Sequence, residues 1–121
     1  KMQDIKEYVR LKGMKNVDVA NDADDSNEAL NLADFGGVVR ASSAMGSDKN
    51  VNWVLPSVGS NQIGEVIMFK GATDGSPDRT ITIKPNSGEK IDGTTNQTVV
   101  LQSPNAAVSL VVVAAGELAI F

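Results

Sequence analysis

The chain has 121 residues and a formal net charge of −4, with no Cys and no His. This length suits one domain with a modest core. Missing Cys and His exclude disulfides, zinc sites built on these residues and catalytic triads that use His. The acidic balance argues against a nucleic-acid partner, and no run approaches the roughly 18 apolar residues needed to span a membrane. We expect no metal ion and no cofactor.

The first section, residues 1–16, carries five basic residues and only two acidic ones. Met2, Ile5 and Val9 have helical spacing, whereas Val9 and Leu11 alternate with basic residues as in a strand. We predict an arm with one or two helical turns. It either packs on its own domain, contacts nucleic acid, or grips a neighbouring subunit or another acidic protein surface. The candidate docking residues of this arm are Lys6, Arg10, Lys12 and Lys15.

Residues 17–34 are acidic and contain no Lys or Arg. An EF-hand beginning at Asp22 fails, because its Gly and Glu positions hold Asn27 and Ala33. A cation site of another kind stays open. The preferred interpretation is a solvated linker with one helical turn over residues 27–30, capped by Asp25 or Ser26. The predicted division is a basic arm and acidic linker over 1–28 and a β domain over 29–121.

Short strands are predicted over residues 35–44, 51–55 and 65–70. In the second of these, Val51, Trp53 and Leu55 share one face. Trp53 is interpreted as a buried core ring, with a sugar-stacking platform as the alternative. Residues 71–78 contain Asp-Gly-Ser-Pro, a strong turn signal, and are expected to form an exposed tip.

The most informative stretch is residues 79–93. Ile81 and Ile83 alternate with Thr and Lys, which predicts a half-buried strand. Pro85 ends it, and Asp92-Gly93 is suited to a tight turn with positive φ. We expect a rigid corner of strand, turn and strand.

The last strands are predicted over 98–102, 108–113 and 118–121, with a hairpin around residues 114–116. The apolar run over 108–113 indicates a strand covered on both faces, and the second cover in so small a chain is expected to be another subunit. The candidate oligomer or core-packing residues are Val108, Leu110, Val111, Val112 and Val113. Together the elements predict an all-β chain, a small β-sandwich or jelly-roll-like domain preceded by the arm.

The order of turn and apolar positions resembles a small β module of tailed-phage virion proteins, found in capsid decoration proteins, head fibres and tail-fibre segments. The ending departs from the pattern, because residues 115–121 replace the Asp-Gly-x-x-Trp with which such modules often close. The resemblance covers residues 29–121 and rests on residues 29–37, Trp53-Val54-Leu55-Pro56, Ile63-Gly64, Thr80 to Ile83, Pro85, Gly88, Ile91-Asp92-Gly93, Val99 to Leu101 and Val108 to Val113.

The resemblance implies a structural virion protein on the capsid surface, a decoration or head-fibre subunit. It would form a homotrimer, dock on the acidic surface of the major capsid protein through the candidate residues of the basic arm, and present its β domain outward. The alternative is a receptor-binding segment of a tail fibre that recognises host-surface glycan. A glycan-cleaving enzyme would need two carboxylates flanking the scissile bond. We expect no enzyme, because most candidates lie at turns without aromatic subsites; they are Glu65, Asp74, Asp78, Glu89 and Asp92.

Overall fold

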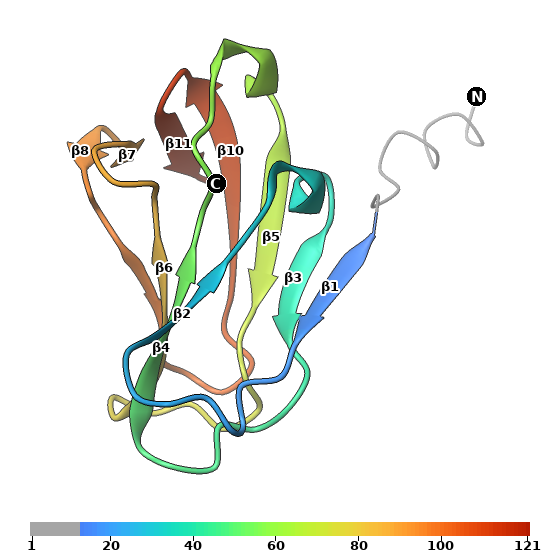
Figure 1. The fold of residues 1–121 in the computed structure, drawn as a ribbon, viewed down its shortest axis with the longest axis vertical. Coiled ribbons are helices and arrows are strands. Elements are labelled where there is room, and N and C mark those ends of the chain that lie inside the picture. Colours follow the sequence, from blue (N-terminus) through green and yellow to red (C-terminus); the bar gives the residue numbers. More distant parts are fainter. Residues whose placement is uncertain (1–12) are drawn as a thin grey trace.

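The structure, a computed structural model, describes residues 13–121, in which eleven strands form two mixed sheets (Figure 1). The seven-stranded sheet has the order β1 (Met14–Val17), β3 (Val38–Ala41), β5 (Val66–Lys70), β10 (Ala107–Ala114), β11 (Glu117–Ile120), β7 (Lys90–Ile91) and β8 (Thr94–Thr95). The four-stranded sheet has the order β2 (Ser26–Ala29), β4 (Lys49–Val54), β6 (Arg79–Lys84) and β9 (Val99–Leu101). Two short 3₁₀ turns, η1 (Leu32–Asp34) and η2 (Ser60–Gln62), lie in the connections.

From β1 to β6 the chain alternates between the two sheets, and strands of the same sheet pair in parallel. Met14 pairs with Val38, an offset of 24 (14 to 38), and Val38 pairs with Met68, an offset of 30 (38 to 68). Parallel strands need a long crossover, and here each crossover is a strand of the opposite sheet. The all-β prediction is therefore confirmed, and the chain path is a solenoid-like arrangement of coils, which differs from the predicted sandwich or jelly-roll-like path.

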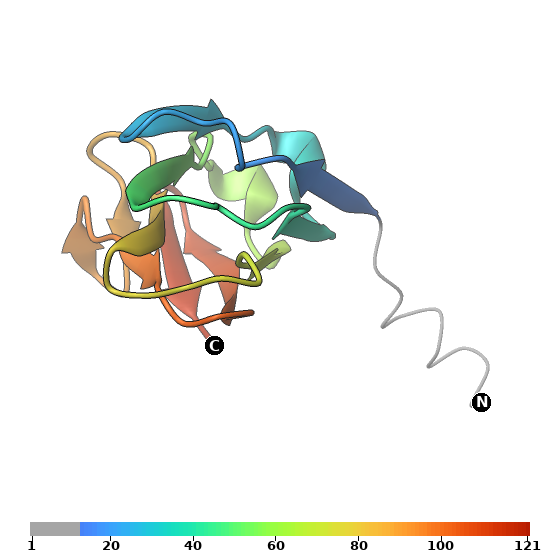
Figure 2. The same ribbon diagram turned by 90° about the horizontal axis from the view of Figure 1, so that it is seen from below.

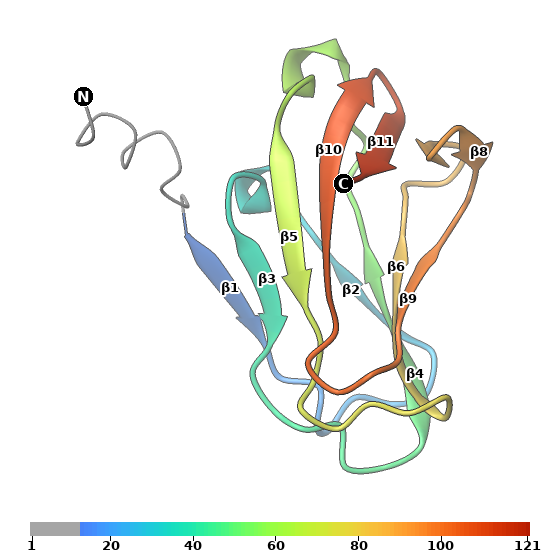
Figure 3. The same ribbon diagram turned by 180° about the vertical axis from the view of Figure 1, so that it is seen from behind.

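The C-terminal part closes this coil with antiparallel strands. β10 pairs with β5, and β9 pairs with β6. β10 and β11 form the predicted hairpin, with a register irregularity between Val112 and Ala114. Figures 1 and 3 show β10 lying beside β5 from both sides of the molecule.

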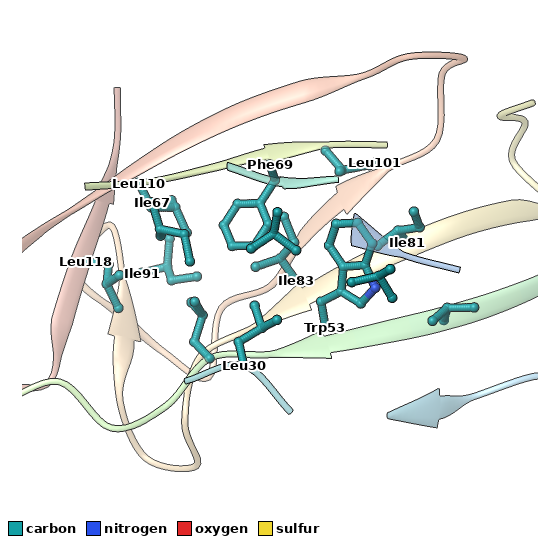
Figure 4. Close-up of a cluster of buried hydrophobic side chains, with 14 of the residues drawn as sticks. Leu30, Trp53, Ile67, Phe69, Ile81, Ile83, Ile91, Leu101, Leu110 and Leu118 are labelled. Atoms are coloured by element: carbon teal, nitrogen blue, oxygen red, sulfur yellow. The ribbon is translucent and has the colours of Figure 1, made fainter. Parts of the chain in front are cut away.

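The core lies between the two sheets, which Figure 2 shows as two layers seen along the strands. Trp53 of β4 is fully buried, and its ring lies 6.1 Å from that of Phe69 on β5, centroid to centroid. The labelled side chains in Figure 4 come from both layers and meet in the middle. The prediction that Trp53 is a core ring is confirmed, and the sugar-stacking alternative is wrong because the ring cannot be reached.

The strand alternation predicted for residues 79–84 is also confirmed. Ile81 and Ile83 are buried, while Thr80, Thr82 and Lys84 lie on the outer face. The corner that follows turns as expected, since Asp92 has φ 51° and Gly93 has φ 79°.

The N-terminal predictions need correction where the structure describes them. The expected helical turn over residues 27–30 is wrong, because Ser26–Ala29 is strand β2 and pairs with β4. The boundary drawn between residues 28 and 29 therefore falls inside a strand. Local charge and capping signals suggested a linker, but parallel pairing with a distant strand outweighs such local preferences.

Gly75 marks a close approach of two backbone segments. A Cβ added there would lie 2.4 Å from the carbonyl carbon of Ser103. The 71–78 segment is consequently packed against the turn before β10, with Ala72 buried, and is not the freely exposed tip predicted from its sequence.

We expect Gly75→Ala to lower the free energy of unfolding by about 1–3 kcal/mol, because the new methyl group forces the two backbones apart. Chemical denaturation followed by Trp53 fluorescence measures this. Gly13→Ala is the matched control, since a Cβ at Gly13 meets no atom of residues 13–121 within 4 Å. Equal stability of the two variants would contradict the packing described here.

Candidate functional site

The ammonium group of Lys49 lies in a cradle of three backbone carbonyls. Its Nζ donates hydrogen bonds to the carbonyl oxygens of Val19 at 2.6 Å, Ala20 at 2.9 Å and Asp22 at 2.9 Å. The residue is only 7% exposed. An ammonium has three donors, so this arrangement satisfies it completely. Lys49 thereby fastens the loop between β1 and β2 to the start of β4.

Three acidic side chains of the same loop, those of Asp18, Asp24 and Asp25, accept hydrogen bonds. Asp18 accepts from Ser43 Oγ at 2.7 Å and from the backbone N–H of Ala20 at 3.0 Å, and these bonds lower the pKa of its carboxyl group. Asp24 accepts from the backbone N–H of Asn50. Within residues 13–121 no three acidic residues come together to hold a metal ion. The cation bound by this acidic loop is the ammonium of Lys49, which is held by backbone carbonyls.

Polar side chains cover the outer face of the four-stranded sheet. Asn50 Oδ1 accepts hydrogen bonds from Thr80 Oγ1 at 2.8 Å and Thr82 Oγ1 at 2.6 Å. Asn50 Nδ2 donates to Asn52 Oδ1 and Asp25 Oδ1. These groups satisfy one another, so we interpret the network as support of β4, of β6 and of the turn just before β2.

Three of the five candidate catalytic carboxylates hold turns together. Glu89 accepts from Ser57 Oγ and from the backbone N–H of Val58, and Asp92 accepts from the backbone N–H of Ile120. Asp74 accepts from the backbone N–H groups of Met45 and Gly46. The remaining two, Glu65 and Asp78, are exposed. These contacts give the first three carboxylates a structural role.

Asp74 links two loops. Its bonds from Gly46 N–H at 2.9 Å and Met45 N–H at 2.7 Å lower the pKa of the carboxyl group, with a smaller contribution from Arg79 at 3.3 Å. Arg79 also pairs with Asp48 at 3.1 Å. The segment that connects β3 to β4 is thus tied to the segment that connects β5 to β6.

A hollow of about 450 Å³ lies on the outer face of the four-stranded sheet. It is formed where the ends of β2, β4 and β6 meet the turns that follow β6 and β8, and we call it the Lys84 hollow. Its lining combines two amides, two hydroxyls, one ammonium and two apolar side chains, namely Asn27, Val54, Lys84, Pro85, Ser87, Asn96 and Thr98.

Apolar side chains form a band across the outer face of the seven-stranded sheet, and the same side also carries the polar residues Asn16, Arg40, Lys70 and Ser109. Val66, Val111 and Ala119 lie in one cross-strand row, and Met14, Val38 and Met68 in another. We call these residues, together with Val113 and Phe121, the apolar face. Met14 is 59% exposed, Val113 45% and Phe121 65%.

The predicted packing residues divide between the two sides of β10. Leu110 and Val112 are buried in the core, and Val108 packs against it. Val111 is half-buried and Val113 exposed on the outside. The chain by itself therefore covers one side of this strand fully and the other only in part.

The four predicted arm residues are only partly described. Lys6, Arg10 and Lys12 lie outside the described residues. Lys15 lies in β1, paired with Val39, so its assignment to an arm is corrected to a place in the seven-stranded sheet.

Sequence reasoning missed Lys49 and its cradle, because the predicted strand begins only at residue 51. A signal was present in the alternation of Lys49, Val51 and Trp53 with Asn50 and Asn52. That pattern predicts a strand that begins at Lys49 and turns its lysine inward. Only the fold places the loop carbonyls of residues 19–22 around the ammonium group.

No protein-family model, curated protein or solved structure matches this chain. In the part of the chain that the structure describes, neither short helix has the length or apolar character to cross a bilayer.

We expect Lys49→Met to lower the free energy of unfolding by at least about 2 kcal/mol, because three carbonyls lose their donor at a position where the lysine is largely buried. Lys70→Met is the matched control. Its Nζ donates to a single carbonyl, that of Asn105, at the exposed surface. Lys70→Met should lower the free energy of unfolding by no more than about 0.5 kcal/mol. Urea titration of both variants measures the difference, and similar midpoints would contradict the role given to Lys49.

Asp74 should make stability fall in acid. The pKa of Asp74 in the folded chain lies below the unfolded value of about 3.9. The carboxylate therefore contributes its full stabilisation of the fold above the unfolded pKa, and this stabilisation is lost as the pH falls through the folded pKa. We expect Asp74→Asn to be less stable at pH 7 and to converge with the unchanged protein below about pH 4. Asp78→Asn, at an exposed position nearby, is the control and should show no such convergence.

Proposed function

We propose that this chain is a structural subunit of a virion, a capsid decoration or head-fibre protein that docks on the major capsid protein and displays its β domain outward. The proposal includes assembly as a homotrimer and no catalytic activity. It draws on the sequence resemblance to small β modules of tailed-phage virion proteins. In this role the two sheets act as the rigid layers of a β-sandwich or jelly-roll-like domain, although the chain path is solenoid-like.

The observation that carries the proposal is the apolar face. Its side chains lie in register across β1, β3, β5, β10 and β11 and stay partly or largely exposed in the single chain. Contiguous apolar surface of this kind marks an interaction site. Covering it with sister chains removes that surface from water and explains why Val111 and Val113 face outward on a strand so rich in valine.

The structural role of Asp74, Glu89 and Asp92 also supports a non-catalytic function. Each of these carboxylates accepts backbone hydrogen bonds that hold a turn in place. Using any of them as a catalytic acid would release a connection between strands. The fold thus employs these groups to make a rigid scaffold.

A second candidate function, recognition of host-surface glycan by a tail-fibre segment, is favoured by the Lys84 hollow. Its amide and hydroxyl groups suit the hydroxyls of a sugar, and it lies on the sheet opposite the apolar face. A chain assembled through the apolar face would leave this hollow accessible.

Val111→Asp should convert the assembly to monomers, because a carboxylate placed in an apolar contact is buried without a partner. The control is Val100→Asp. Val100 is 47% exposed on β9 of the other sheet, so its variant should assemble as the unchanged chain does. Light scattering coupled to size-exclusion chromatography measures the masses, and near-ultraviolet circular dichroism verifies folding. A folded Val111→Asp variant that still assembles, or an unchanged chain that is monomeric at micromolar concentration, would refute the proposal.

The place of the protein in a particle is tested separately by counting its copies in intact virions by mass spectrometry. Hundreds of copies per particle support capsid decoration. A handful of copies supports the tail-fibre alternative instead.

A further inference from the structure

We propose that the Lys84 hollow binds a carboxylated sugar, a hexose ring that carries an acid group. This inference rests on the second candidate function and deepens it by naming the class of ligand. It is independent of assembly through the apolar face.

The first argument is charge. The chain has a net charge of −4, yet the hollow is lined by one ammonium group, that of Lys84, and by no carboxylate. Within residues 13–121 the ammonium of Lys84 forms no ion pair. Lys49, by contrast, is saturated by three carbonyls. Lys84 is therefore a cation held at the edge of a hollow with its donors available for an acid group.

The second argument is hydrogen-bonding capacity. Asn96 Oδ1 accepts from the backbone N–H of Gly88 at 2.8 Å, which leaves its Nδ2 group as a donor. Asn27, Ser87 and Thr98 add further donors and acceptors. Sugar hydroxyls both donate and accept, so this mixed lining suits a ring with several hydroxyls better than a single inorganic anion.

The third argument is shape and rigidity. A volume of about 450 Å³ lies in the range of small-molecule sites. Val54, which is half-buried, supplies an apolar surface for the C–H side of a ring, while Pro85 is buried and adds little exposed area. Lys84 and Val54 are held by the parallel ladder of β4 and β6, and Asn96 is held by bonds to residues 88 and 89. The groups are placed before any ligand arrives, which lowers the entropic cost of binding.

The test is a titration of ¹⁵N-labelled protein, followed by backbone amide shifts, with four probes: a glucuronate disaccharide, the matching glucose disaccharide, inorganic phosphate and a glutamate-rich peptide. We expect shifts at residues 84, 96 and 98 with the glucuronate probe and at least about tenfold weaker binding of the glucose probe. Lys84→Gln should weaken glucuronate binding by about tenfold, and Asn27→Ala should weaken it to a smaller degree. Lys90→Gln, an exposed lysine on β7, should bind as the unchanged protein does.

Each other outcome has a defined meaning. Equal binding of both disaccharides would overturn the acidic class while leaving glycan recognition in place. If phosphate or the peptide bound as tightly as the glucuronate probe, the assignment of the ligand as a sugar would be overturned. Absence of shifts with every probe would overturn both the site and the glycan-recognition function, whereas the structural proposal is decided by the assembly measurements alone.

Discussion

The fold depends on one constraint: a strand of a coil can bury its inner side only against the strands of the opposite sheet and the coils next to it. From β1 to β6 the chain crosses between the sheets at every connection, so the core is built from residues far apart in sequence. Trp53 and Phe69 meet in this way, one from each sheet. With few aromatic rings in the chain, the core relies on Val, Ile and Leu packed between the layers, and the antiparallel strands β9 and β10 then close the last coil.

Polar contacts determine how the connections sit on this core. The Lys49 ammonium fastens the first loop, and Asp74 and Glu89 fasten loops between later strands. Each bond joins segments about 30 residues apart, which is close to the repeat of the coil. Charged groups that resemble catalytic or metal-binding residues in the sequence therefore serve to hold neighbouring coils in register.

The two outer faces differ in character, and this difference connects structure with the proposed functions. An apolar band crosses the outer face of the seven-stranded sheet between polar residues, as expected of a surface that packs on another protein. The outer face of the four-stranded sheet carries the hydrogen-bonded network around Asn50. Beside this network lies the Lys84 hollow, whose lining includes hydrogen-bond donors that can serve a ligand. A protein that assembles through one face and displays the other would need this asymmetry.

Strands with strict alternation were predictable from sequence alone, as Ile81, Ile83 and Trp53 show, because burial of every second residue leaves a period that local sequence records. Turns at Asp92-Gly93 and the last hairpin were predictable for the same local reason. Which strands become neighbours was not, since parallel pairing joins residues 24 to 30 positions apart and leaves no local mark. Tertiary structure alone decided that Ser26–Ala29 is a strand, that Lys49 lies among carbonyls and that Lys84 lines a hollow, because each depends on what a distant coil places beside it.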